Sequence, residues 1–184
     1  MSSCEHACAA ARRALLRAGA LGGLSLLLAG CGFHLRGSTN LAFDRLLVQG
    51  QPGPMIDLLK RTILATTDAR LVGQASQAQA VFTLLQESTS QVPTAYNADG
   101  TVAQYILNDV VRFRLDAPNG RVYIPPTTIS RSSRLSYSTA AALGKAYEAD
   151  MLYASMRQSL VDRILFQLSN FHPPAGAGAD APAR

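Results

Sequence analysis

A run of two-residue alternation from position 102 to 116 constrains the fold of this chain more than any other segment. Its odd positions are mainly apolar and its even positions mainly polar, with Tyr105, Leu107, Val111, Phe113 and Leu115 set against Gln104, Asn108, Arg112 and Arg114. Alternation of this length predicts a long strand with one buried and one polar face, although Asp109 interrupts the apolar side. Such a strand needs a second layer to cover its apolar face.

Two helices are expected to supply that layer. Pro54 stands where a helix can begin without losing a hydrogen bond, and apolar residues recur at helical spacing from there to about position 66. A longer helix is expected from Tyr147 to about Ser169. Its apolar stripe consists of Leu160, Val161, Ile164, Leu165 and Leu168.

Further strands are expected at 43–48, 70–72, 80–92 and 121–137, with turn sequences at 97–100 and 118–120. Pro125 and Pro126 cannot donate hydrogen bonds to a neighbouring strand, so the last strand is expected to be bulged or to lie at an edge. The order strand, helix, strands, helix predicts a single α+β domain over residues 41–172, built as a two-layer sandwich.

The first 30 residues are expected to be a cleavable signal peptide. Three arginines between positions 12 and 17 precede an apolar run of about 11 residues, whereas a helix that spans a bilayer needs about 20. The sequence LAGC at 28–31 resembles the lipobox of bacterial lipoproteins, which places a covalent N-acyl diacylglyceryl lipid on Cys31. Several acyl chains hold a protein stably at a bilayer. In enterobacterial lipoproteins, an aspartate directly after the lipidated cysteine retains the protein at the inner membrane. This chain has Gly32 at that position, which by analogy favours the inner leaflet of the outer membrane.

The remaining termini are expected to carry no fold of their own. Residues 31–40 form a lipidated linker, and residues 173–184, rich in Pro, Ala and Gly, form a disordered tail. Without the signal peptide, the 17 basic side chains fall to 14 and the 12 acidic ones to 11, a mild positive excess. No basic run with interleaved aromatics occurs, so no nucleic-acid partner is expected.

The expected mature chain also lacks the residue patterns of an enzyme or a metal site. Cys31 is its single cysteine, and its histidines, His34 and His172, lie beside the expected anchor and tail. No HExxH, GxSxG, Walker or GxGxxG motif occurs. We interpret Asp99 and Asp109 as turn or solvated carboxylates. No catalytic residue, resident cofactor or metal is therefore predicted.

Three segments together resemble one bacterial family. Residues 31–37, CGFHLRG, resemble the start of mature lipopolysaccharide-assembly lipoproteins, the LptE family. Residues 99–105, DGTVAQY, are similar to that family's turn and strand of form NGxxAEY. Lys145 and the segment EADM at 148–151 are similar to the start of its last helix. The resemblance covers most of residues 31–170 in the same order, and the first segment is its specific part.

The resemblance implies a fold, a partner and a function. The family fold is a two-layer sandwich of two helices on a mostly four-stranded mixed sheet. Family members partner the outer-membrane β-barrel LptD, plug its lumen, aid its assembly and help to deliver lipopolysaccharide to the outer leaflet. A plug needs a surface that suits a polar lumen. The strand side chains Gln104, Asn108, Thr127, Ser130 and Ser132 would supply one.

Lys145 occupies the place of a family lysine proposed to contact lipopolysaccharide. The family has a second proposed basic residue just before the turn, and Ala98 occupies that position here. This chain therefore lacks one of the two basic contacts to phosphate that the family implies. Four strand arginines are candidates to compensate, because neighbouring strands can gather side chains into one patch. They are Arg112, Arg114, Arg131 and Arg134.

Two other functions stay open on the sequence. One is an auxiliary lipoprotein of an envelope ABC-type transport system that binds phospholipid, and the other is an envelope hydrolase. Co-purification with an ATPase complex would indicate the first of these, whereas co-purification with a β-barrel would indicate the LptD-partner function. Turnover lost on substitution of a single Ser or Asp would indicate the hydrolase.

Overall fold

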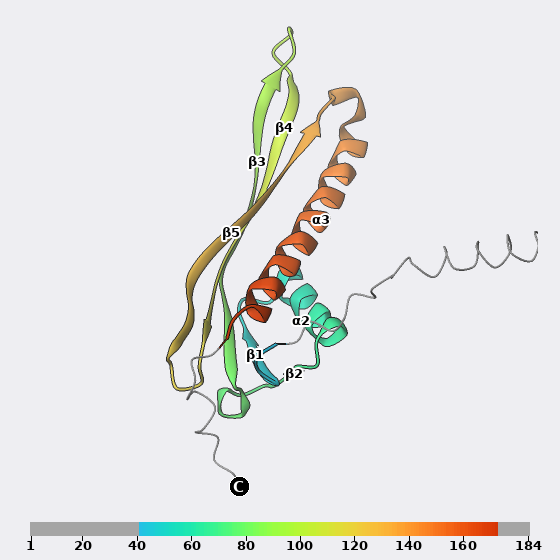
Figure 1. Ribbon diagram of the computed structural model, residues 1–184. Coiled ribbons are helices and arrows are strands. Elements are labelled where there is room, and N and C mark those ends of the chain that lie inside the picture. Colours follow the sequence, from blue (N-terminus) through green and yellow to red (C-terminus); the bar gives the residue numbers. More distant parts are fainter. Residues whose placement is uncertain (1–40, 173–184) are drawn as a thin grey trace, which may run out of the picture. The chain divides into compact units, whose positions relative to one another are not determined.

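The computed structural model describes residues 41–172. In chain order the elements are β1 (Arg45–Gln49), α2 (Pro54–Thr66), β2 (Arg70–Leu71), a 3-10 turn (Ala75–Gln77), β3 (Ala80–Tyr96), β4 (Val102–Asp116), β5 (Val122–Ser136), a second 3-10 turn (Thr139–Ala141) and α3 (Ala142–Ser169) (Figure 1). The predicted signal peptide, Cys31, the linker at 31–40 and the tail at 173–184 lie outside the described residues, and the domain boundaries stay a prediction.

The five strands form one mixed sheet in the order β2-β1-β3-β4-β5. β1 pairs in parallel with both β2 and β3, while β3, β4 and β5 run antiparallel to one another. The expected α+β sandwich of two helices on a mixed sheet is confirmed. The family resemblance implied a mostly four-stranded sheet, whereas the sheet has five strands, because the short strand expected at 70–72 is present as β2 and pairs with β1 at the edge.

α2 and α3 cover the same face of this sheet and share one core with it. From α2, Met55, Ile56, Leu59 and Ile63 are buried, and α3 contributes its whole predicted stripe, Leu160, Val161, Ile164, Leu165 and Leu168. The rings of Phe82 and Phe113 stack at 5.4 Å between centroids at the centre of the sheet side. The helical periodicity therefore predicted which residues form the core.

β4 has the two faces that its alternation predicts. Leu107, Val111, Phe113 and Leu115 are fully buried beneath the helices, whereas Arg112 and Arg114 are exposed on the other side. The hairpin turns on either side of β4 use Gly100 at φ +83° and Gly120 at φ +84°, a backbone region that favours glycine. β5 is an edge strand, and its pairing with β4 is irregular between Phe113 and Asp116, near the two prolines. Both expected effects of the prolines are thus present.

Two elements extend beyond their predicted ends. β3 continues from the expected residue 92 to Tyr96, because its far half is held by pairing with β4 rather than by burial. α3 begins at Ala142, five residues before Tyr147. Its first turn is exposed and contributes nothing to the buried stripe from which the helix was predicted, although Ala, Leu and Lys favour a helix there.

Candidate functional site

Lys145 lies in the first turns of α3 and is held by a neighbour on the same helix. Its Nζ is 2.7 Å from Oε2 of Glu148, three residues along the helix. The Lys145 side chain is about a quarter exposed, at 23%. The lysine therefore carries a partner carboxylate that an anionic ligand must displace or share.

The four candidate arginines do not form one patch. Arg112 and Arg114 project from the face of β4 opposite the helices, and Arg114 Nε is 2.9 Å from Oδ2 of Asp116. Arg134 is opposite Ile106 in the β4–β5 ladder and shares that open face. Arg112 is six positions after Ile106 on β4, which is roughly 20 Å along the strand.

Arg131 lies on the other side of the sheet. It pairs with Asp109, whose side chain is fully buried on the helix-covered face, and directly opposed residues of antiparallel strands share a face. The hypothesis that neighbouring strands gather all four arginines is therefore wrong. Three of them share the open face and Arg131 faces α3.

The open face of the sheet is polar over much of its length. Gln104, Asn108, Ser130 and Ser132 lie on it, and Asn108 Nδ2 donates to Ser90 Oγ at 3.3 Å. Thr127 does not belong to this set, since it pairs with Phe113 of the buried face. Four of the five polar residues proposed for a plug surface are thus on one continuous surface that neither α2 nor α3 covers.

The opposite, helix-covered face contains a polar layer that divides the core. Leu107, Leu135, Ala149 and Met156 form a small cluster near the start of α3, separate from the main cluster around Phe82 and Phe113. Asp109 lies in β4 between Leu107 of the small cluster and Val111 of the main one. Its carboxylate is 0% exposed, and neither oxygen has a hydrogen-bond partner among the described residues.

Three elements contribute the remaining groups of this layer. Glu87 of β3 and Arg157 of α3 approach to 3.5 Å between Oε1 and Nε, and Tyr153 of α3 donates its hydroxyl to the carbonyl of Ser90 at 3.0 Å. Burial raises the pKa of Asp109, the charge of Glu87 raises it further, and Arg157 opposes both. Burial together with the nearby Asp109 also raises the pKa of Tyr153.

The two carboxylates considered in the sequence differ in environment. Asp99 is exposed in the β3–β4 turn, where its Oδ1 accepts hydrogen bonds from the hydroxyl and the amide of Thr101, which lower its pKa. It is a turn residue, as predicted. Asp109 is buried, so its interpretation as a solvated carboxylate is wrong. Its position among the apolar residues of β4 was the sequence signal for a polar group inside the domain.

Sequence reasoning also missed two arginines of α3. Arg157 reaches the polar layer, and Arg163 borders a groove beside β5. Arg157 comes three residues before Leu160 and four before Val161, a spacing that puts it on the buried stripe. That spacing was a readable signal for Arg157, whereas nothing in the sequence distinguishes Arg163 from a solvated helix arginine.

Neither membrane-spanning nor metal-binding features occur in the described part of the chain. No helix among residues 41–172 combines the length and the apolarity needed to cross a bilayer. The same residues contain no group of three or more His, Cys, Asp or Glu side chains placed to hold a metal ion.

Comparison with known proteins identifies the family. The model of the LptE family, described as lipopolysaccharide-assembly, matches residues 44–168. The LPS-assembly lipoprotein LptE of Photorhabdus laumondii is 27% identical over 155 residues, which are 83% of this chain and 84% of that protein. The LPS-assembly lipoprotein LptE of Pectobacterium atrosepticum is 27% identical over 152 residues, 80% and 82% of the two chains.

Solved structures share the fold. The solution structure of lipoprotein B from Nitrosomonas europaea has a TM-score of 0.67 and 26% identity, covering 75% of this chain and 90% of that one. The crystal structure of rare lipoprotein B from Shewanella oneidensis has a TM-score of 0.60 and 22% identity, covering 68% and 93%. With the family model matching more than half of its length, the chain belongs to the LptE family of lipopolysaccharide-assembly lipoproteins.

Proposed function

We propose that this protein is anchored in the outer membrane by lipid on Cys31, partners an LptD-type β-barrel, plugs its lumen and aids both barrel assembly and delivery of lipopolysaccharide to the outer leaflet. Membership in the LptE family makes it a membrane-anchored envelope lipoprotein of lipopolysaccharide transport and an assembly factor rather than an enzyme. Membership also favours this reading over a phospholipid-binding ABC auxiliary protein or a hydrolase.

The open face of β3, β4 and β5 carries the proposal. It presents Asn108, Ser130 and Ser132 with the exposed arginines, and neither helix covers it. The lumen of an outer-membrane barrel is polar, so a sheet face with these polar and charged side chains can enter it, although Ile106 and Val110 share this face. A second surface supports a protein partner, because Leu143, Tyr147 and Met151 make an exposed apolar stripe at four-residue spacing on α3.

Site-directed photo-crosslinking in cells tests the barrel contact. A photoreactive residue at Asn108 or Ser132 is expected to give a covalent adduct with the barrel, because both positions lie on the open face. Ala65, exposed on α2, is the matched control and is expected to give little adduct. Adduct yields that are equal at all three positions, or extraction of the lipoprotein alone in mild detergent, would contradict the proposed plug.

Lys145 is proposed to contact a phosphate of lipopolysaccharide. The Lys145→Asp variant of the purified lipoprotein is expected to bind lipopolysaccharide about tenfold more weakly, the loss typical of one hydrogen bond to a charged group. Its thermal midpoint should change little, since an exposed ion pair three residues apart contributes about 0.5 kcal/mol or less. Binding is measured by equilibrium titration and folding by thermal denaturation.

Glu148→Gln is the control for this experiment. It removes the carboxylate that Lys145 contacts at 2.7 Å and leaves the lysine in place. This variant is expected to bind lipopolysaccharide at least as tightly as the parent. Equal affinity of the parent and Lys145→Asp for lipopolysaccharide would contradict the proposed contact of Lys145, irrespective of the result for Glu148→Gln.

A further inference from the structure

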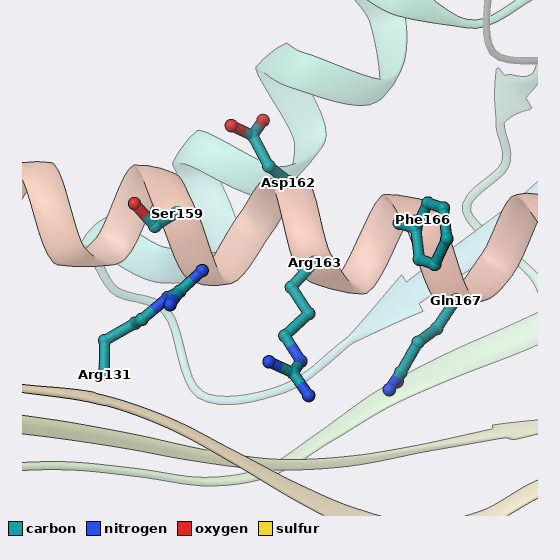
Figure 2. Close-up of a pocket in the computed structure, with 6 residues that line it drawn as sticks. All are labelled: Arg131, Ser159, Asp162, Arg163, Phe166 and Gln167. Carbon is teal, nitrogen blue, oxygen red and sulfur yellow. The ribbon is translucent and has the colours of Figure 1, made fainter.

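A groove of about 440 Å³ runs between α3 and β5 (Figure 2). It is lined by Arg131 of β5 and by Ser159, Asp162, Arg163, Phe166 and Gln167 of α3. Arg163 and Gln167 extend from the helix toward the strands, and Arg131 extends from β5 toward the helix. Two guanidinium groups from different elements therefore border the same space.

Neither guanidinium group forms an ion pair with another described residue, although Arg131 is opposite the buried Asp109 in the β4–β5 ladder. The ion pairs found among residues 41–172 involve Arg114, Lys145 and Arg157, and none involves Arg131 or Arg163. Asp162 points to the side of the helix away from Arg163, and its Oδ1 accepts from Gln158 Nε2 at 3.2 Å. The groove thus has two guanidinium groups without an ion-pair partner among the described residues and one carboxylate, Asp162, in its lining.

Two more side chains narrow the class of ligand. Gln167 lines the groove, and its Oε1 is buried with no hydrogen-bond donor among the described residues, so a ligand hydroxyl can satisfy this oxygen once the side chain turns toward the groove. Phe166 is 67% exposed at the border of the groove and offers an apolar contact. Two guanidinium groups that border one space match the charge and the oxygen geometry of a phosphate group. A neutral sugar offers no such charge.

We propose that this groove binds a phosphate group carried on a hydroxylated lipid headgroup, with Arg131 and Arg163 on the phosphate and Gln167 on a hydroxyl. The site is separate from Lys145, because Arg163 is 18 positions farther along α3, a distance of about 27 Å along the helix. A phosphorylated sugar of lipopolysaccharide and a phospholipid headgroup both have this chemistry. The choice of lipid A as the first probe rests on the proposed function, whereas phosphate recognition rests on the groove itself.

The test uses the full lipoprotein in detergent with three probes: bisphosphorylated lipid A, the same lipid A after dephosphorylation, and phosphatidylglycerol micelles. The variant Arg131→Gln with Arg163→Gln is expected to bind bisphosphorylated lipid A at least tenfold more weakly than the parent. Dephosphorylated lipid A should show no such difference. The control variant Arg70→Gln with Arg121→Gln removes the same charge from two exposed positions outside the groove and should bind like the parent.

The outcomes separate the groove from the proposed function. Equal affinity of the groove variant and the control variant for every probe overturns the groove, and so does an equal loss with and without phosphate on lipid A. If the parent binds no lipid A, but the groove variant binds phosphatidylglycerol more weakly than the parent, the phosphate site in the groove is supported and the lipopolysaccharide role is contradicted. If lipid A binding depends on Lys145 alone, the lipopolysaccharide role is supported and the phosphate site in the groove is contradicted. Unchanged thermal midpoints show that the variants are folded.

Discussion

The Cys31→Ala variant is expected to lose its membrane anchor completely. The proposed lipid is attached through the thiol of Cys31, which alanine lacks, and each buried methylene of an acyl chain contributes about 0.8 kcal/mol to membrane binding. Removing several chains therefore leaves the domain with no comparable attachment of its own. The expected result is an unlipidated mature N-terminus and a shift of the protein from the outer-membrane fraction to the periplasm.

Intact-mass analysis of the N-terminal peptide is the decisive measurement, because contact with a barrel can retain some unlipidated domain at the membrane. Cys8→Ala is the matched control, since Cys8 lies within the expected signal peptide and should leave lipidation unchanged. An acyl mass on the Cys31→Ala protein, or a parent whose Cys31 sulfur is unmodified, would contradict the anchor and with it the proposed location.

The faces of the long strands were predictable because burial and alternation report the same physical constraint. Leu107 and Phe113 are buried and Arg112 is exposed, as period two requires once one face of β4 is covered. The stripe of α3 was predictable for the same reason at period 3.6. The start of α3 at Ala142 was not, because its exposed first turn carries no pattern of burial.

The candidate site was less predictable, since it depends on register across strands. Arg131 and Arg134 are three residues apart on one strand, so alternation alone places them on opposite faces. Which face each one shares with Arg112 follows only from the pairing of β4 with β5, which sets Arg131 against Asp109. The groove adds Arg163 from a helix far along the chain, and its approach to Arg131 is purely tertiary.

Asp109 gives the domain a stability that depends on pH. Because burial and Glu87 raise its pKa in the folded state, the folded protein holds this proton more tightly than the unfolded chain does. The stabilisation is fully present below the ordinary value of 3.8 and is lost as the pH rises through the raised folded value. At higher pH the domain then contains a charged carboxylate that is 0% exposed and has no hydrogen-bond partner among the described residues.

The Asp109→Asn variant is therefore expected to be more stable than the parent at neutral pH, by roughly 1 kcal/mol or more, because an ionised carboxylate costs more to bury than a neutral amide of the same shape. Asparagine keeps the shape but cannot ionise, so the fall in stability on raising the pH from 4 to 8 should be smaller than in the parent. Chemical denaturation across this range measures both effects, with Asp150→Asn on the exposed side of α3 as control. An asparagine variant less stable than the parent at neutral pH would mean that attraction to Arg157 outweighs desolvation.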